Sequence, residues 1–513
     1  MDATRPPSTL VDGALRRFGP GRNTLDTDQE ASYKRHLYSL QLLAIWGFFV
    51  MPNIKGWNST LFNLYHRLDK QYSTYPAVEH FQENISAFER FSALRDSRKA
   101  QRPLALSVNI PFCANACYYC TAKNIVTKDR SRANQYLQCL EQEIHSVAQH
   151  IAGGQRIDEL HVGGGTPTFL NPGELRQLMK CLQDNFNIVS NNFTHYSIDI
   201  DPRETDWSTM GVLRDIGFNR VNIEVQGLDP KVQRAINRLQ TIEQTQAIVE
   251  AARTLQFRTV SISLIYGLPQ QTPRSFAQAV LDVLQLTPDR ISLQGYQHQP
   301  DKHPIQQRIN ASELPSNSEI EVILSQAVQQ LEEAGYRYIG MGNFALPDDD
   351  FASAQEDGTL QHGIQGYSTH VNGDTIGFGV SAISQLGGLY YHNSHDLNDY
   401  QTACRNKQLP PALGLHCTKS DQIHLAVIDG LTCQFAIDCR AIEQRFAIDF
   451  KQYFVSQWPQ LESMQTQGLL KINEHSIQMT TEGRLYTLAV CQVFDLYFKK
   501  QTNKVKRPLN HVM

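Results

Sequence analysis

The chain has 513 residues, of which 41% are hydrophobic and 19% are charged, so it can bury a large core and form more than one domain. Its formal net charge of -4 gives no general attraction to nucleic acid or to an anionic membrane surface, and we expect neither as a partner. Its 10 cysteines lack the dense, regular spacing of a secreted disulfide-rich protein, which favours a reducing cytoplasm.

Residues 1–69 carry no pattern that indicates chemistry, and we interpret them as an N-terminal extension of unknown role. Residues 1–23 contain acidic and basic residues but no apolar core of a secretory signal. The apolar stretch 37–51 is interrupted by Ser39 and Gln41 and is shorter than the roughly 20 residues of a spanning helix. We therefore predict a buried or interface helix there and no membrane span.

An apolar strand is predicted at 104–110, and three cysteines follow it at C-x3-C-x2-C spacing: Cys113, Cys117 and Cys120. A closed structural zinc site needs four nitrogen or sulfur ligands, and no fourth cysteine or paired histidine follows nearby. Three thiolates can instead hold three irons of a cubane and leave the fourth iron open to a substrate-like molecule. The spacing thus favours an iron-sulfur cluster, with three unrelated buried thiols as the alternative.

Short β-branched runs alternate with helical periodicity from residue 104 to residue 296. The predicted strands are 104–110, 159–163, 194–201, 220–226, 258–266 and 290–296. The predicted helices between them include 133–152, 172–185, 241–255 and 273–286. This alternation predicts an α/β fold in which parallel strands, joined by right-handed crossovers, curve into a partial or complete (β/α)6 barrel similar to a TIM barrel.

In such barrels the chemistry lies at the carboxyl ends of the strands, where the cysteine loop would meet the loops after the other strands. Gly163, Gly164 and Gly165 allow a backbone to approach a ligand closely and would leave amide groups free to bind it, although such a run is often only a turn. Asp199 and Arg238 are candidates to bind ribose hydroxyls and a carboxylate, respectively; solvated side chains are the alternative.

After the barrel, a helix is predicted at 316–335, followed by a loop region rich in glycine, histidine and aspartate. Residues 391–513 read as a mainly helical domain with a small hairpin at 470–479, without metal-ligand spacing. We therefore predict an N-terminal extension (1–69), a barrel domain with its elaboration (70–390) and a C-terminal domain (391–513).

The cysteine motif, with an aromatic residue before its last cysteine, resembles the signature of the radical S-adenosylmethionine (SAM) superfamily. This resemblance implies a 4Fe-4S cluster whose open iron is chelated by the amino and carboxylate groups of SAM. Reductive cleavage of SAM would then give methionine and a 5'-deoxyadenosyl radical.

A closer resemblance extends from about residue 72 to the C-terminus, to the oxygen-independent coproporphyrinogen III oxidase family. The motifs that carry it are 72–76 (YSTYP), 110–113 (IPFC), 123–127 (KNIVT), 161–168 (HVGGGTPT), 201–204 (DPRE), 264–269 (LIYGLP), 339–341 (IGM) and 379–384 (GVSAIS). It implies that the three cysteines bind the cluster. It also implies that SAM is contacted by residues at the family's cofactor positions: Ser107, Tyr119, Gly164, Gly165, Thr166, Asp199, Gln226, Arg238, Ser263, Gln297 and Ile383.

The same resemblance implies oxidative decarboxylation of two propionates of coproporphyrinogen III to vinyl groups, with an electron donor such as a flavodoxin-like protein. It identifies no catalytic side chain beyond the cofactor residues. The chain departs from the family pattern at Gln71, Ser107, Asn109, Ala122, Asp199, Glu224 and Ser263. These departures leave two alternatives open: a related radical SAM enzyme acting on haem or another tetrapyrrole, and a haem-binding chaperone.

Overall fold

The structure is a computed structural model, and it describes residues 57–69, 74–151, 155–189, 194–370 and 373–498. The apolar stretch 37–51, predicted as a buried helix, lies outside these residues. Among the described helices, none combines the length and the apolar character needed to cross a bilayer.

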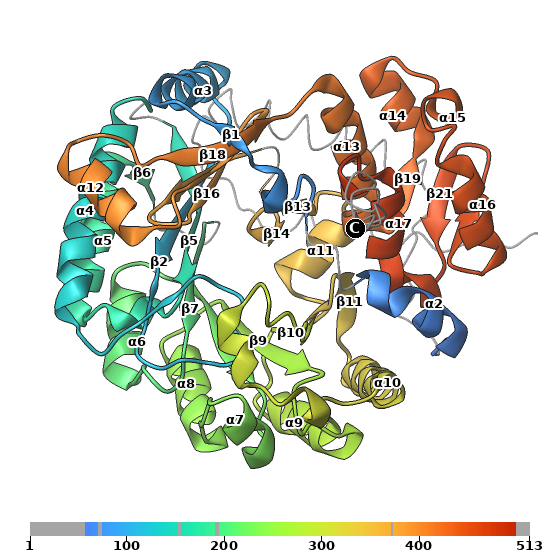
Figure 1. Cartoon of the computed structure of the whole chain (residues 1–513), viewed down its shortest axis with the longest axis horizontal. Helices are drawn as coiled ribbons and strands as arrows, with labels where there is room; N and C mark the ends of the chain where they lie inside the picture. The colour runs from blue at the N-terminus through green and yellow to red at the C-terminus, as the bar shows by residue number, and fades with distance from the viewer. Residues whose placement is uncertain (1–56, 70–73, 152–154, 190–193, 371–372, 499–513) are drawn as a thin grey trace, which may run out of the picture. The chain divides into compact units, whose positions relative to one another are not determined.

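Six parallel strands form the centre of one large sheet, in the same order as in the chain (Figure 1). They are β2 (Leu104–Ile110), β5 (Arg156–Gly164), β7 (His195–Ile200), β8 (Arg220–Gln226), β9 (Thr259–Tyr266) and β10 (Arg290–Gly295). Helices on the outer side connect them: α4 (Ser131–Ala148), α5 (Pro172–Asn185), α6 (Trp207–Asp215), α7 (Pro230–Ala235), α8 (Ile242–Thr254) and α9 (Pro273–Gln285). The barrel predicted from the alternation is confirmed, and of the two forms left open it is the partial one, because the order of the described strands does not close on itself.

Most of the connecting helices begin at strong local signals. Asn171 caps α5 and Thr241 caps α8, and in both helices the side chain three residues later completes a capping box. Proline occupies the first position of α5 and of α9, where its missing N–H costs no hydrogen bond. These signals explain why the helix starts agree with the sequence predictions to within two residues.

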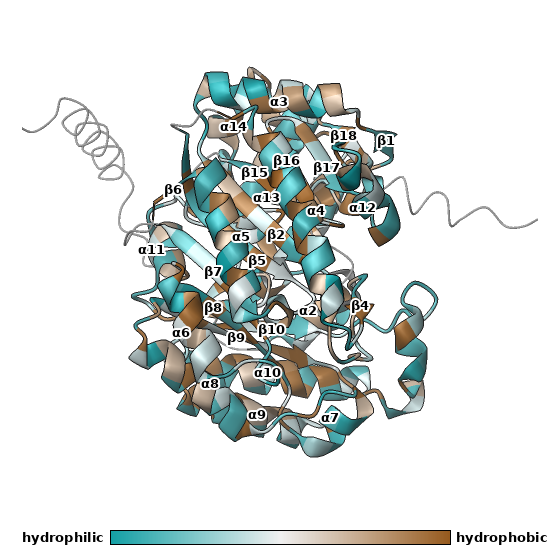
Figure 2. Cartoon of the chain, turned by 90° about the vertical axis from the view of Figure 1, so that its left-hand side faces the viewer, coloured by the Kyte–Doolittle hydropathy of each residue, from teal (hydrophilic) through white to brown (hydrophobic). Residues whose placement is uncertain are grey.

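The barrel strands turn apolar side chains outward and many polar side chains inward. Val162 and Ile198 are buried beneath the helices, whereas His161 and Ser197 line an internal cavity. Figure 2 shows the largely hydrophilic outer surface of α4 and α5 lying over the more hydrophobic strands β2 and β5. Because the inner face is polar, the barrel interior is available for ligands rather than filled as an apolar core.

Further strands extend the sheet on both edges. Next to β2 lie β15 (Asp374–Phe378), β16 (Ile383–Leu386), β17 (Leu389–Asn393), β18 (Ala412–His416) and β1 (Glu83–Asn84). Next to β10 lie β12 (Asn343–Ala345) and β11 (Arg337–Gly340). The sheet thus continues to His416, and the predicted domain boundary at residue 391 falls within β17.

The C-terminal part is mainly helical, with α13 (Lys419–Gln434), α14 (Cys439–Phe446), α15 (Phe450–Tyr453), α16 (Trp458–Thr466) and α17 (Thr487–Phe494). A small antiparallel sheet contains β19 (Ala436–Asp438), β20 (Leu470–Ile472) and β21 (Ser476–Met479), and the β20–β21 pair confirms the predicted hairpin. Helix α2 (Ser59–Asp69) packs against α17 and the 3-10 turn η5 (Glu482–Tyr486).

The remaining elements are short or peripheral. They are α3 (Ala87–Ala100), α10 (Asn317–Glu333), α11 (Asp350–Glu356), α12 (Leu397–Arg405), β3 (Phe112–Cys113), β4 (Ile125–Val126), β6 (Asn187–Ile188), β13 (Gln361–Gly363), β14 (Gly366–Ser368), η1 (Val78–His80), η2 (Pro167–Phe169), η3 (Pro304–Arg308) and η4 (Ala311–Glu313). Helix α10 confirms the prediction at 316–335.

Candidate active site

The cysteine loop leaves the carboxyl end of β2 and returns through β4. Strands β3 and β4 pair in parallel, which closes the loop and brings its three cysteines to one cavity of about 1100 Å³. Cys113, Cys117 and Cys120 are all half-buried and line that cavity. The loop therefore presents three thiols to a common space at the mouth of the barrel.

The three thiols fit a cubane better than a single ion. Within the described residues, the group of metal-ligating atoms lying within 4.8 Å of one another is at another place in the fold and contains no cysteine. Thiolates on three different irons are farther apart than ligands on one ion. Burial raises the pKa of the Cys113 thiol to about 12. Iron binding must therefore displace the proton of this thiol. The positive charge of the irons would stabilise the thiolate that results.

Hydrogen-bond donors surround the sulfur atoms. Thr166 Oγ1 lies 3.7 Å from Cys113 Sγ, and Asn124 Nδ2 lies 3.8 Å from Cys120 Sγ. Two guanidinium groups approach Cys117 Sγ, with Arg203 Nη2 at 3.5 Å and Arg238 Nη1 at 3.7 Å. Donors and positive charge at these positions would stabilise an anionic thiolate cluster.

The glycines after β5 have a different role from the one predicted. Gly164, Gly165 and Thr166 line the cavity, but the amides of Gly165 and Thr166 donate to Ile110 O and Phe112 O, each at 2.8 Å. Of the three glycine amides predicted to be free for a ligand, that of Gly165 is therefore already used within the protein. The glycines bring β5 close to the segment that carries Cys113.

Arg238 is buried, and its guanidinium group forms an ion pair with Asp201 of the protein itself. Its Nη1 lies 3.0 Å from Asp201 Oδ2, and Arg203 Nη2 lies 2.6 Å from the same oxygen. Burial acts to raise the pKa of Asp201, but the hydrogen bond from Arg203 and the charge of Arg238 lower it overall. Asp201 therefore stays ionised and holds both guanidinium groups beside Cys117.

Two buried polar atoms at this cavity have no hydrogen-bond partner among the described residues. They are Nε of Arg238, a donor, and Oε1 of Gln226, an acceptor, and both residues line the cavity of the cysteines. Leaving such atoms unpaired costs about 1–3 kcal/mol each, so unpaired atoms beside a cavity indicate a place for a polar ligand. The carboxylate and amino group of SAM are complementary to one donor and one acceptor.

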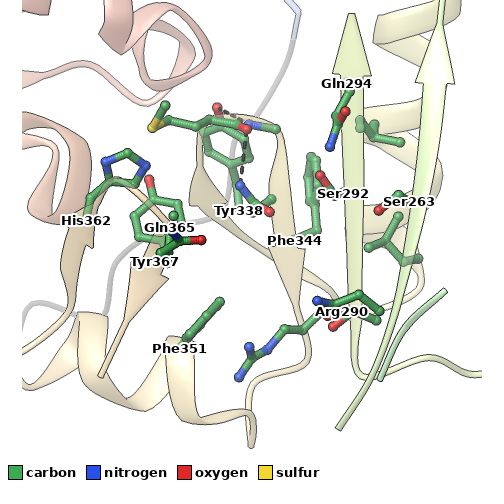
Figure 3. A pocket seen from close by; sticks show the side chains of 18 of the residues that line it. Ser263, Arg290, Ser292, Gln294, Tyr338, Phe344, Phe351, His362, Gln365 and Tyr367 are labelled. Atoms are coloured by element: carbon green, nitrogen blue, oxygen red, sulfur yellow. Dashed lines mark hydrogen bonds between the residues drawn. The ribbon is translucent and has the colours of Figure 1, made fainter. Parts of the chain in front are cut away.

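Inside the barrel, Asp199 interacts with His161 and Asn222. Asp199 Oδ2 lies 3.6 Å from His161 Nε2, and Asn222 Nδ2 donates to Asp199 Oδ1 at 3.1 Å. Asp199 lines the cysteine cavity and also a second cavity of about 860 Å³, part of which is shown in Figure 3. Asp199 therefore lies where the two cavities meet, with one carboxylate oxygen held by Asn222.

The eleven predicted cofactor residues divide into three groups. Eight line the cysteine cavity: Tyr119, Gly164, Gly165, Thr166, Asp199, Gln226, Arg238 and Gln297. Ser263 lines the second cavity, where its hydroxyl lies 3.3 Å from Glu224 Oε1. Ser107 is buried in β2 and Ile383 is half-buried in β16, and neither lines these two cavities. The roles of all eleven in cofactor binding stay predictions.

Sequence patterns did not identify Arg203 and Asn124 as partners of the thiols, or Glu224 as a carboxyl group inside the barrel. Arg203 reaches the site because it folds back onto Asp201, two residues earlier. The alternation of β8, in which every second side chain faces the interior, could have predicted that Glu224 lies on the inner face of the barrel. Its position between Ser263 and Gln226, to which it is hydrogen-bonded, required the register of β8 and β9.

Glu224 should make stability depend on pH. Burial and the nearby Asp199 charge raise its pKa from 4.5 to about 7. The folded state therefore binds this proton more tightly than the unfolded state, and stability falls as pH rises from about 4.5 to about 7. We expect Glu224→Gln to stabilise the protein by on the order of 2 kcal/mol above pH 7, with the difference shrinking towards pH 5.

Urea unfolding of the anaerobic protein at pH 5 and at a pH above 7 measures the difference in the free energy of unfolding between wild type and Glu224→Gln. Glu333→Gln, which changes an exposed carboxylate on α10, is the control and should show no such dependence. Equal stability of wild type and Glu224→Gln at both pH values would contradict the ionisation assigned to Glu224.

Comparisons with known proteins agree with this geometry. The Radical SAM superfamily model matches residues 109–283, and the HemN C-terminal domain model matches residues 417–486. An oxygen-independent coproporphyrinogen III oxidase from Pseudomonas aeruginosa is 51% identical over 441 residues, covering 86% of this chain and 96% of that protein. Its counterpart from Escherichia coli K12 is 38% identical over 445 residues, covering 87% and 96%.

A solved structure supports the same assignment. The coproporphyrinogen III oxidase (HemN) of Escherichia coli, described as a radical SAM enzyme, superposes with a TM-score of 0.81 at 39% identity. The match covers 86% of this chain and 100% of that one. The residues that line the cysteine cavity come from the part matched by the superfamily model and from segments on either side of it. The chain belongs to the oxygen-independent coproporphyrinogen III oxidase family of the radical SAM superfamily.

Proposed function

We propose that this chain is an oxygen-independent coproporphyrinogen III oxidase, which converts two propionates of coproporphyrinogen III to vinyl groups in haem biosynthesis. The observation that carries the proposal is that three thiols and two unpaired buried polar atoms, Arg238 Nε and Gln226 Oε1, share one cavity. When bound, the 4Fe-4S cluster and SAM supply the one-electron chemistry that removes a hydrogen atom from the β-carbon of a propionate. The substrate radical would then lose carbon dioxide and pass one electron to an external one-electron acceptor, which leaves the vinyl group.

The protein's own residues bind, orient and shield the reacting groups. Cys113, Cys117 and Cys120 would hold the cluster, and Arg238 and Gln226 would bind the polar end of SAM. Phe498 and Asp495 from the C-terminal segment line the same cavity.

A partner must supply electrons to the cluster, and we propose an acidic flavodoxin-like protein. Lys123 and Lys128 are exposed on the loop that carries the cysteines, and they would attract negative charge close to the cluster. None of the ten cysteines forms a disulfide, which suits a reducing compartment such as the cytoplasm.

An anaerobic assay of the reconstituted protein with coproporphyrinogen III, SAM and a chemical reductant tests the function. We expect two vinyl groups and two molecules of carbon dioxide per substrate molecule. Cleavage of SAM without vinyl product would overturn the substrate and favour a related enzyme acting on another tetrapyrrole. Stoichiometric binding of haem without SAM cleavage would favour a haem carrier instead.

A further inference from the structure

A group of potential metal ligands lies at the opposite end of the barrel from the cysteine loop. Glu159 is near the start of β5 and His195 is the first residue of β7, whereas the cysteines follow the carboxyl end of β2. His370 joins them from the segment after the β13–β14 hairpin. The group combines two imidazoles and one carboxylate, a ligand set that zinc accepts.

The ligand atoms converge on one point. One atom of each of the three side chains lies within 4.8 Å of one atom of both others. His195 Nδ1 and His370 Nε2 each lie 3.9 Å from Glu159 Oε1. A tetrahedral zinc ion with bonds of about 2.0–2.2 Å holds its ligand atoms roughly 3.4 Å apart. The two nitrogen–oxygen distances exceed this value by about half an ångström, and the two histidine nitrogens lie within 4.8 Å of each other, so small side-chain movements would bring all three ligand atoms to one ion.

An unpaired nitrogen points to a ligand at this place. Nε2 of His370 is buried and has no hydrogen-bond partner within the part of the chain that the structure describes, although it faces the Glu159 carboxylate. The His195 and His370 rings are T-shaped with centroids 4.5 Å apart, so they are not simply stacked on each other. A metal ion between these nitrogens and Glu159 would satisfy the unpaired atom.

Neighbouring groups orient the ligands in the way that metal sites require. Ser368 Oγ donates to Glu159 Oε1 at 2.6 Å, and the carboxylate of Asp350 lies 3.6 Å from His195 Nε2. The negative charge of Asp350 therefore favours the proton of His195 on Nε2, which leaves the lone pair of Nδ1 toward Glu159. A carboxylate behind a ligating histidine is a common outer-shell partner.

The charges around the group are nearly balanced. Arg220 and Arg258 both pair with Asp350, at 2.6 Å each, and Arg290 pairs with Asp349 at 2.9 Å. The three arginines carry one positive charge more than the two aspartates, and the carboxylate of Glu159 offsets it. A divalent ion would leave a net positive charge here, which favours hydroxide or a carboxylate as an additional ligand.

Space for that additional ligand exists. Glu159 and His195 line the second cavity, together with His362 and Gln365 of the β13–β14 hairpin. In Figure 3, His362, Gln365 and Tyr367 on the hairpin lie across this space from Arg290 on β10. An ion held by Glu159, His195 and His370 would thus have one position open to the cavity.

We propose that Glu159, His195 and His370 bind one divalent ion of the zinc type, which ties the segment after the β13–β14 hairpin to the amino-terminal ends of β5 and β7. The fourth position is open to water or to an anionic ligand in the second cavity. This site is separate from the iron-sulfur site and does not depend on the proposed function, because no cysteine contributes to it.

Metal analysis of the holoenzyme tests the proposal. The protein is reconstituted with its iron-sulfur cluster, loaded with zinc chloride and passed over a desalting column, and zinc and iron are then measured. We expect about one zinc ion per chain in the wild type and less than a tenth of that in His370→Ala and His370→Gln, with unchanged iron. His416→Ala is the matched control, since His416 Nε2 lies 3.3 Å from the Glu89 carboxylate on the surface.

Hydrogen exchange gives a second measurement that is independent of activity. Zinc should slow amide exchange in residues 361–370 of the wild type and of His416→Ala, but not of His370→Gln. A wild type that holds no zinc after loading would overturn the proposal, as would a His370→Gln variant that binds zinc like the wild type. The zinc content of the wild type is by itself a test of the site, so the test remains valid even if a variant fails to fold.

Discussion

Replacement of Cys113, Cys117 or Cys120 by serine should each abolish the iron-sulfur cluster and, with it, SAM cleavage. The three thiols line one cavity, and each would hold a different iron, so losing any one of them opens the cubane. Activity should fall to background, and the iron content and visible absorbance of the purified protein should fall to a similar extent in the three variants. Iron analysis and absorption spectra after anaerobic reconstitution measure both effects.

Cys181→Ser is the matched control, because Cys181 is half-buried like the three ligands but lies on helix α5, away from the cavity. It should retain the iron content of the wild type. Cys433 and Cys491 in the C-terminal part should also be replaceable without loss of iron. Full iron in any single variant of the three candidate ligands would contradict their assignment.

Gly165→Ala should disrupt the cluster site, although it adds only one methyl group. A Cβ at this position would lie 2.6 Å from Phe112 O and 2.9 Å from Cys113 Sγ, closer than such contacts normally occur. The amide of Gly165 also donates to Ile110 O, so the backbone cannot move away without breaking that bond. We expect the substitution to displace the cysteine loop and to lower iron content and activity by at least about tenfold.

Gly211→Ala on helix α6 is the control, because a Cβ there meets no atom within 4 Å. Iron analysis and the electron paramagnetic resonance spectrum of the reduced cluster compare the two variants. A Gly165→Ala protein with full iron and a wild-type spectrum would contradict this prediction, because it would show that the cysteine loop can move to accommodate the methyl group and still hold the cluster. A larger residue such as valine would meet the same atoms, so substitution at this glycine cannot test SAM binding separately from cluster assembly.

Local sequence signals determined most of the barrel. The six parallel strands follow from alternating β-branched runs and helical periodicity, and helix starts such as Asn171 and Thr241 follow from capping boxes. The cysteine spacing identified the three candidate cluster ligands, because their separation along the chain alone places them on one loop. These features depend on neighbouring residues, which is why a single sequence carries them.

Contacts between distant segments were decided only by the tertiary structure. The pairing of Arg238 with Asp201 beside Cys117, and the use of the Gly165 amide by Ile110, depend on how separate loops meet at the barrel mouth. The strands β15 to β18, which extend the sheet beyond β2, were not predicted because short strands gain their stability from pairing partners rather than from their own pattern.

The potential metal ligands at the other end of the barrel were likewise brought together only by the tertiary structure. Glu159, His195 and His370 come from two strands and the segment after a hairpin, and no spacing in the sequence joins them. The sequence by itself determined the alternation of elements, the cluster motif and the family, because these are read from short segments. The tertiary structure decided which side chains share a cavity and which polar atoms stay unpaired, because both depend on strand register and on packing between segments far apart in the chain.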